Sequence, residues 1–545
     1  MVNACPVIPK PQNSPFVSFA KGTKERDLLQ REIERSRSKK HLDSSAIPLW
    51  INGPVVTGTK RYCIVPHNLK QGLGLYSVAS EYHVARAVET VLAARDRWVQ
   101  APWFMRFHIF RKAARLIETK YLIPLVTAVM EDYSKNAFEA FIDVQELIDF
   151  LNFNVYFAYE LYSKQPDSNA DTFNMINYSP HEGFIFAVSP NNFIAINGNL
   201  CTAPLIMGNV VIAKPSSDVV YSFNMFLNIL IEAGLPRDVL AVLYGDSKVI
   251  GEMLLDHPML AGVHFTGGTD TFNAMNRTVG QNIEKYKNYP KIVGETGGKD
   301  PIVVYDDHDP LQTATAIVVG GFGAQGRKCS ATSRVYMTQG MLVRVLPHLK
   351  KYLGMIKVGD VADFRNYMGA IINEREFKKI NEYINRAHLD KDAKSILSGK
   401  VGFASNGYFI PPTIILTTNP DYVTVREEIF GPVVTIVTIP EERFEKEVLD
   451  ICDRTSPYAL TGAVHTGDVL KFCEALQKLR YAVGNFYDDR TTAAMVNAQP
   501  FSGGRKSGTN SKVGWWPNLM NWVNMQTVCL RLSKTTFPPA CVDPE

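Results

Sequence analysis

Residues 183–193 read Gly-Phe-Ile-Phe-Ala-Val-Ser-Pro-Asn-Asn-Phe, and this stretch indicates the fold class. An apolar run of five residues between a glycine and a Ser-Pro-Asn-Asn turn is typical of a short buried strand. Similar runs follow at 210–213, 239–243 and 262–265, with predicted helices over 218–233 and 248–255 between them. Strands that alternate with helices predict βαβ units around a parallel sheet, which binds nucleotides at the carboxyl ends of its strands.

The segments on either side extend this α/β pattern. Upstream, apolar residues at helical spacing predict helices over residues 24–36, 80–97, 106–129 and 137–161. An alternating strand is expected at 171–180, and a second series of strands and helices runs from 301 to about 483. The sequence therefore predicts two α/β domains, with the strand at 171–180 and the C-terminal stretch 521–532 outside them.

The composition limits the kinds of protein that the chain can be. With 545 residues, 46% apolar and 21% charged, it matches an ordinary globular protein of several domains. A net charge of +4 is too small to indicate nucleic-acid binding. No apolar run reaches the roughly 18–20 residues that span a bilayer. We therefore expect neither a nucleic-acid partner nor a membrane partner.

The cysteines and the N-terminal residues indicate a compartment. The eight cysteines include no Cys-x-x-Cys pair and no His/Cys cluster at zinc spacing, so we expect reduced thiols and no metal site. The N-terminal stretch lacks the basic and apolar regions of a secretory signal. No arginine precedes Arg26, although a mitochondrial presequence is rich in arginine. These features favour a cytoplasmic protein.

Two residues are suited to covalent chemistry. Cys329 follows a run of small residues, and the adjacent Arg327 and Lys328, together with a nearby helix N-terminus, would favour its thiolate. The alternative is a buried structural cysteine. Glu295 comes directly after a short apolar strand and before paired glycines, where a parallel sheet places its active site. The alternative for Glu295 is a surface turn.

Three predicted strands end in residues suited to a cofactor or an oxyanion. Asn192 follows the first strand, either as a turn residue or as an amide donor to an oxyanion. Lys214 follows the second, where a lysine suits a polyanionic cofactor. Residues 265–269, Phe-Thr-Gly-Gly-Thr, open a helix whose N–H groups can face a pyrophosphate. The Gly-x-Gly-x-x-Gly of the ordinary Rossmann fingerprint is missing.

The order and spacing of these segments resemble the aldehyde dehydrogenase superfamily. Glu295 precedes Cys329 at the family's spacing, and residues 427–432, Glu-Glu-Ile-Phe-Gly-Pro, are similar to its cofactor-gripping segment. From about residue 15 to 532 the chain further resembles the Δ1-pyrroline-5-carboxylate dehydrogenase subfamily. The stretches that carry this second resemblance are 146–150, 198–204, 207–211, 458–464, 484–487 and 499–510.

The resemblance implies an α/β aldehyde dehydrogenase fold. In this fold a Rossmann-like NAD-binding domain is joined to an α/β catalytic domain and a β oligomerisation flap. The implied boundaries are 14–165 and 181–294 for the NAD(P)-binding domain, 295–515 for the catalytic domain, and 166–180 with 516–535 for the flap. The flap pairs with a partner subunit in this superfamily, so we expect a homodimer or a higher homo-oligomer.

The resemblance also implies a mechanism. Cys329 matches the nucleophile, Asn192 and the Cys329 N–H match the oxyanion hole, and Glu295 matches the base for thioester hydrolysis. CoA-acylating relatives dispense with this base, so Glu295 favours release of a free acid. The implied reaction is NAD(P)-dependent oxidation of an aldehyde to a carboxylic acid. The subfamily's reaction converts L-glutamate 5-semialdehyde to L-glutamate in proline catabolism.

A set of cofactor-binding residues follows from the same resemblance. They match the contacts to the adenosine ribose, the turn at the pyrophosphate and the grip on the nicotinamide ribose. The set comprises Ser189, Lys214, Ser216, Ser217, Phe265, Gly267, Gly268, Thr269, Glu428 and Phe430. Ser217 stands where strictly NAD-preferring relatives often carry a glutamate. We therefore expect NAD, with NADP as an alternative that no carboxylate repels at this position.

The substrate residues match the subfamily less closely. Phe193 and Phe501 match two aromatics that flank the aliphatic stem of glutamate semialdehyde, and Ser330 matches a serine that contacts its carboxylate. The usual Gly-Ser or Gly-Ala pair, whose N–H groups bind the α-carboxylate, is replaced by Ala493 and Ala494. The substrate is expected to be a small aldehyde.

Further departures leave alternatives open. Ala140 stands where the subfamily places a glutamate near the substrate's amino group, and Asp143 is off register. Arg327 replaces a glutamine and Asn191 an aromatic. These changes admit a paralogue that oxidises a different aldehyde in a specialised biosynthetic pathway. A catalytically silent structural or binding member is a further alternative. The mitochondrial matrix is the alternative location, because eukaryotic members are usually matrix enzymes.

Overall fold

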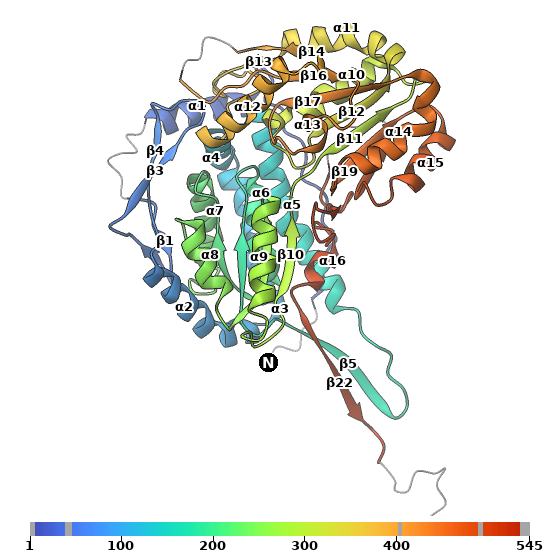
Figure 1. The fold of residues 1–545 in the computed structure, drawn as a ribbon. Helices are drawn as coiled ribbons and strands as arrows, with labels where there is room; N and C mark the ends of the chain where they lie inside the picture. The colour runs from blue at the N-terminus through green and yellow to red at the C-terminus, as the bar shows by residue number, and fades with distance from the viewer. Residues whose placement is uncertain (1–5, 39–45, 402–405, 489–493, 535–545) are drawn as a thin grey trace, which may run out of the picture.

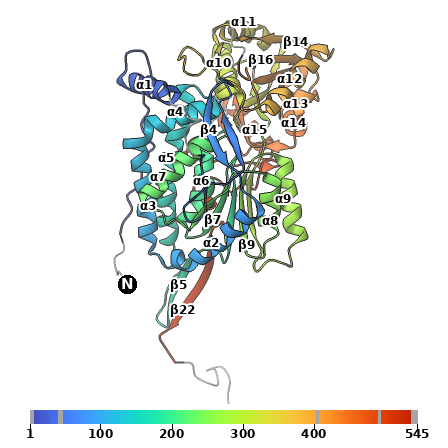
Figure 2. The ribbon, with the colours of Figure 1, turned by 90° about the vertical axis from the view of Figure 1, so that its left-hand side faces the viewer.

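The computed structural model describes residues 6–38, 46–401, 406–488 and 494–534. Within these ranges the chain forms two α/β bodies that pack against each other and a two-stranded arm that projects from them (Figure 1). In the view turned by 90°, helices lie on both sides of the sheet of the first body (Figure 2). The α/β fold with two sheets and an arm agrees with the fold class predicted above.

The first body contains the predicted parallel sheet, in the order β10-β9-β6-β7-β8-β1-β2. Its strands are β1 (Leu49–Trp50), β2 (Pro54–Val55), β6 (Phe184–Val188), β7 (Val210–Lys214), β8 (Leu240–Val242), β9 (Leu260–Thr266) and β10 (Lys291–Glu295). The strands β6 to β10 are mutually parallel, whereas β1 and β2 are antiparallel at one edge. The carboxyl ends of β6, β7, β9 and β10 therefore all lie on the same side of the sheet, and the loops that follow these strands can meet there.

Some helices of this body precede the parallel strands in the chain, and others connect one strand to the next. They are α1 (Lys24–Ser38), α2 (Glu81–Gln100), α3 (Trp103–Leu116), α4 (Leu122–Tyr133), α5 (Ala137–Tyr162), α6 (Ile194–Ile206), α7 (Val220–Ala233), α8 (Ser247–Leu255) and α9 (Thr269–Gln281). A hairpin of β3 (Lys60–Ile64) and β4 (Gly72–Ser77) lies beside them. One continuous cluster of buried apolar side chains fills this body.

Two predicted helices differ from the observed ones. The helix expected over 106–129 is divided by a π-helical turn at Ile117–Tyr121. Pro124 explains the division, because it lacks an N–H and its ring crowds the carbonyl four residues earlier. The helix expected from residue 218 begins at Val220. Residues 217–218 form a turn instead, since the Asp218 carboxylate accepts hydrogen bonds from Asn191 and Asn373.

The second body is built on another seven-stranded sheet, in the order β14-β16-β17-β12-β11-β19-β20. Its strands are β11 (Asp300–Val304), β12 (Thr332–Thr338), β14 (Ala393–Ser398), β16 (Thr413–Thr417), β17 (Val433–Ile439), β19 (Thr461–His465) and β20 (Asn485–Asp488). All pair in parallel except β14. The longer helices are α10 (Pro310–Phe322), α11 (Gln339–Met355), α12 (Glu374–Leu389), α14 (Glu441–Thr455) and α15 (Val469–Lys478). Two further apolar clusters are buried in this body.

The arm is formed by segments far apart in the sequence. The strand β5 (Thr172–Ser179) pairs antiparallel with β22 (Asn524–Arg531) along its whole length. Both strands project away from the two bodies (Figures 1 and 2). Phe173, Met525 and Leu530 on this arm are about half exposed, at 51%, 53% and 51%. In the described part of the chain, no helix combines the length and apolarity needed to cross a membrane.

Candidate active site

Cys329 lies where two cavities meet. The first, of about 460 Å³, is lined by the loops at the carboxyl ends of β6, β7 and β9 and by Glu428 and Phe430 of the second body. The second, of about 360 Å³, is lined by α5, the start of α6 and residues of the second body. Cys329 lines both cavities, and no other residue predicted as catalytic does so. A thiol at this junction can reach ligands on both sides.

The turn before Cys329 is tight. Ala324 and Gln325 have φ angles of 47° and 58°, in the left-handed region that favours glycine. The Gln325 amide donates to the carbonyl oxygens of Ser134 and Ala370, which anchors the turn. A Cβ on Gly326, whose φ is +64°, would lie 2.4 Å from the Gly431 carbonyl oxygen. This turn therefore sets the position of Cys329 relative to the first body.

The expected activation of the Cys329 thiol by its neighbours is wrong. No helix begins at Cys329, because a 3₁₀ turn precedes it and β12 follows. Lys328 forms an ion pair with Glu139 at 2.8 Å, and Arg327 donates to Asn191. Removal from water, with Asp300 and other carboxylates nearby, raises the pKa of the thiol above its usual range. Without a ligand, Cys329 is therefore protonated at neutral pH.

Asn192 lies next to the Cys329 loop. Its side-chain N–H group donates to the Arg327 carbonyl oxygen at 3.3 Å. An amide carries two N–H donors, so the second is left for a ligand. Asn192 follows β6 and precedes α6, where the Asp143 carboxylate accepts the N–H groups of Ile194 and Ala195 at 3.0 Å each. These bonds hold the loop that carries Asn192.

Glu295 is the last residue of β10 and lines the second cavity together with Cys329. The hydroxyl of Ser502 donates to one carboxylate oxygen, and the Gly503 N–H donates to the other at 3.3 Å. Burial raises the pKa of Glu295 to about 8, although both hydrogen bonds oppose that shift. Ser502 was not among the predicted site residues, although it follows Phe501 in a stretch that carried the resemblance.

Most of the predicted cofactor residues line the first cavity. These are Ser189, Lys214, Ser216, Phe265, Gly267, Gly268, Glu428 and Phe430. Ser217 lies outside this lining. Thr269 lines an adjoining cavity instead, where its hydroxyl is 3.1 Å from that of Tyr458.

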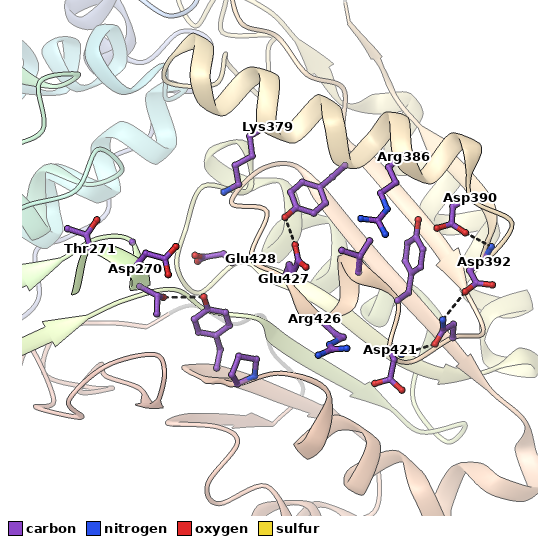
Figure 3. A pocket seen from close by; sticks show the side chains of 18 residues that line it. Asp270, Thr271, Lys379, Arg386, Asp390, Asp392, Asp421, Arg426, Glu427 and Glu428 are labelled. Carbon is purple, nitrogen blue, oxygen red and sulfur yellow. Dashed lines mark hydrogen bonds between the residues drawn. The ribbon is translucent and has the colours of Figure 1, made fainter. Parts of the chain in front are cut away.

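The adjoining cavity, of about 910 Å³, is open and polar, and lies between the start of α9, helix α12 and the loop that contains Glu428 (Figure 3). Lys379 of α12 and Glu428 line both this cavity and the first cavity. Figure 3 shows the Lys379 side chain pointing from α12 toward the side where Asp270 and Glu428 lie. Lys379 was not among the predicted site residues either, although it lies on the amphipathic helix α12.

The first cavity fits an anionic dinucleotide. The Lys214 ammonium is buried, and no carboxylate of the described residues lies within ion-pair distance of it; burial lowers its pKa to about 8. Gly268 caps the N-terminus of α9, and a Cβ there would meet nothing within 4 Å. A buried cation and an open helix N-terminus both favour a phosphate group. The Glu428 carboxylate is held by the Gly298 N–H at 3.0 Å.

The predicted substrate residues gather around the second cavity. Phe193, Ser330, Ala494 and Phe501 line it. Ala493 lies outside the described residues. The second cavity is lined mainly by apolar side chains, which suits an aliphatic chain that ends at Cys329.

Helix α5 contributes charged groups to this cavity that were not predicted. Glu139, Ile142 and Glu146 line it, on one face of the helix. Ala140 is fully buried in the core and does not reach the cavity. Asp143 pairs with the Lys135 ammonium at 2.8 Å, which in turn lies 3.6 Å from the Phe193 ring centroid. Helical spacing along α5 was the signal that could have identified Glu139 and Glu146.

The fold and the two cavities define an enzyme class. The chain belongs to the aldehyde dehydrogenase family, whose sequence model matches residues 57–528. It is 38% identical over 547 residues to the mitochondrial Δ1-pyrroline-5-carboxylate dehydrogenase of Dictyostelium discoideum, with 99% of this chain and 97% of that protein covered. The enzyme of the same name from Emericella nidulans is 37% identical, with 96% and 92% covered.

Solved structures agree with this placement. The Δ1-pyrroline-5-carboxylate dehydrogenase of Mycobacterium tuberculosis bound with NAD superposes with a TM-score of 0.92 at 36% identity. The superposition covers 99% of both chains. The 1-pyrroline-5-carboxylate dehydrogenase from Thermus with bound NAD has a TM-score of 0.88 at 29% identity, with 97% of this chain and 100% of that chain covered.

Proposed function

We propose that this aldehyde dehydrogenase oxidises L-glutamate 5-semialdehyde, formed from Δ1-pyrroline-5-carboxylate, to L-glutamate in proline catabolism, with NAD as cofactor. One observation carries the proposal: a single thiol, Cys329, lies between a cavity that fits a dinucleotide and an apolar cavity that also holds Glu295. Relatives with this activity in their names match nearly the whole chain, and two of the solved neighbours are bound with NAD.

The first half of the proposed mechanism is addition to the aldehyde. The thiol of Cys329 first loses its proton to solvent water, because the thiolate is the nucleophile. The sulfur then bonds to the aldehyde carbon, and the oxygen becomes an oxyanion. The free N–H of Asn192 and the backbone N–H of Cys329 stabilise this charge. Bound NAD supplies the hydride acceptor.

The second half is hydrolysis of the thioester on Cys329. The carboxylate of Glu295 removes a proton from a water molecule, which attacks the acyl carbon. The carbon–sulfur bond breaks, the acid leaves, and the thiol is regenerated. Ser502 and the Gly503 N–H hold Glu295 for this step.

The proposed cofactor contacts follow from the lining of the first cavity. Lys214 and Ser216 hold the adenosine ribose, and Gly267 and Gly268 face the pyrophosphate. Glu428 and Phe430 contact the nicotinamide ribose. NADP remains the alternative, because Ser217 carries no charge to repel a 2′-phosphate.

A second candidate function is oxidation of a different aldehyde in a biosynthetic pathway. The observation that favours it is Ala140, which is buried in the core at the position where the resemblance places a glutamate near the substrate's amino group. Steady-state NADH formation from glutamate semialdehyde and from pentanal, which has the same chain length, separates the two. A charged hydrogen bond to the α-carboxylate contributes roughly 1.5–3 kcal/mol. We therefore expect at least a ten-fold higher kcat/KM for glutamate semialdehyde.

The control for this assay is Cys329→Ala, which should bind NAD and form no NADH. Equal or better turnover of pentanal by the unaltered chain would favour the second function. NADH formation by Cys329→Ala at the unaltered rate would refute the mechanism for both.

We further propose an assembly, a division into domains and a location. The half-exposed apolar side chains of the arm support pairing with a second copy, which gives at least a homodimer. The domain boundaries at 165, 180, 294 and 515 stay predictions. The cytoplasmic location is also a prediction. The mitochondrial matrix is the alternative, because the two relatives named above are called mitochondrial. Imaging of a fluorescent fusion beside compartment markers separates the two locations.

A further inference from the structure

Arg327 is a buried cation on the cofactor cavity that the mechanism above does not use. The residue is 5% exposed and lines the cavity of about 460 Å³. One terminal nitrogen donates to the Asn191 side-chain oxygen at 2.9 Å, and the other donates to the Phe430 carbonyl oxygen at 3.2 Å. Its guanidinium carbon lies 4.7 Å from the centroid of the Phe430 ring. The group is therefore held in a defined plane by two residues of the same cavity.

Both hydrogen-bond partners of Arg327 are neutral. Within the described part of the chain, no carboxylate lies within 4.0 Å of its guanidinium nitrogens. The carboxylate of Asp218 is linked to Arg327 only through Asn191, whose side-chain N–H group donates a hydrogen bond to it at 2.8 Å. Burial lowers the pKa of Arg327 to about 10, while Glu376, Asp218 and Glu428 partly offset that effect. A buried cation without a directly paired anion is costly, and an anionic ligand would remove that cost.

We propose that Arg327 binds the pyrophosphate of the dinucleotide cofactor, at the phosphate on the nicotinamide side. The inference depends on the dinucleotide of the proposed function. A guanidinium has five N–H donors, of which the contacts above use two. Its planar fork matches two oxygens of a phosphate. Phe430, against which it packs, is the residue proposed for the nicotinamide ribose, which places Arg327 toward that end of the cofactor.

The competing explanation is a structural role. Arg327 would then only hold Asn191 and Phe430 in place, and any loss of cofactor affinity would be general. Nucleotides of increasing length distinguish the two. AMP lacks the phosphate on the nicotinamide side, whereas ADP and NAD contain it. A direct contact changes the affinity for ADP and NAD and spares AMP.

The test measures dissociation constants of the full-length chain for AMP, ADP and NAD by calorimetry. Arg327→Gln should weaken ADP and NAD at least ten-fold and AMP less than two-fold. Arg327→Lys keeps the charge but loses the fork, so ADP and NAD should weaken by a smaller factor. Arg375→Gln is the matched control. Arg375 lines the same cavity, but its side chain is 82% exposed and is paired with Glu376 at 3.0 Å. It should change each constant less than three-fold.

Two outcomes would overturn the inference. In one, Arg327→Gln binds ADP and NAD as tightly as the unaltered chain does. In the other, it loses AMP to the same extent as ADP, which indicates a structural role. If Arg327→Gln does not fold, as judged by its thermal unfolding without ligand, Arg327→Lys decides by the same comparison. Failure of the unaltered chain to bind NAD would instead refute the proposed function.

Discussion

Arg327 donates a hydrogen bond to Asn191 at 2.9 Å, and both residues stand at positions where the sequence predicts a departure from the subfamily that it resembles. The usual glutamine and aromatic residue would not form this bond. The Asn191 side-chain N–H group in turn donates a hydrogen bond to the Asp218 carboxylate at 2.8 Å. Arg327 and Asn191 together therefore connect the Cys329 loop to the turn before α7. The two departures are therefore one linked change rather than two independent ones.

The linked change predicts energetic coupling. Arg327→Gln and Asn191→Phe should each lower the free energy of unfolding, while the double variant should lose less than the sum. Residues in one hydrogen-bond network couple by about 0.5–3 kcal/mol. Urea unfolding of the four proteins measures this coupling. Additivity within about 0.3 kcal/mol would show that the contact contributes no coupling.

The amide of Asn192 is predicted to stabilise the oxyanion. Asn192→Ala should lower kcat about 10²–10³-fold, which corresponds to the loss of one oxyanion-hole donor, about 2.7–4 kcal/mol. The affinity for NAD should change little. A higher KM with an unchanged kcat would show instead that Asn192 only shapes the turn after β6.

Glu295 is predicted to act after hydride transfer. Glu295→Gln should release one NADH per active site in a burst and then turn over slowly, because the thioester on Cys329 is no longer hydrolysed. Stopped-flow absorbance at the NADH band measures the burst. A uniformly slow reaction without a burst would place Glu295 in an earlier step.

The hydrogen bond from Ser502 predicts a shift in pH dependence. Glu295 keeps its proton up to a pKa of about 8, so hydrolysis should slow as the pH falls through that value. Ser502 stabilises the ionised carboxylate, and its hydrogen bond lowers the pKa. Ser502→Ala should therefore raise the pKa and move the rising limb of the pH–rate profile to higher pH. The limb should disappear in Glu295→Gln; if it persists there, another group titrates.

The arm is predicted to hold subunits together. Sedimentation at micromolar concentration should show at least twice the chain mass of 60.9 kDa. Leu530→Lys should weaken the assembly at least ten-fold, since burying a leucine contributes about 1.5–3 kcal/mol. Leu389→Lys is the control, because Leu389 is 89% exposed at the end of α12 and away from the arm. A 61 kDa species for the unaltered chain would contradict the prediction.

The sequence by itself determined the strands and the order of the functional segments. The strand Phe184–Val188 was predicted at its observed bounds, because a glycine and a Ser-Pro turn mark its ends locally. The α/β class and the two-body division followed from the same alternation. Cys329, Glu295 and Asn192 were found because their spacing matches a family pattern, and the structure brings all three to the edge where the two bodies meet.

Only the tertiary structure decided what surrounds these residues. Ser502 meets Glu295 across 207 positions, Lys328 meets Glu139 across 189, and Arg327 meets Asn191 across 136. The protonated state of Cys329 also depends on this packing, since burial and carboxylates from distant segments raise the pKa of its thiol. Local sequence sets backbone preferences over a few residues. Contacts between distant side chains form only when the two sheets and α5 pack together.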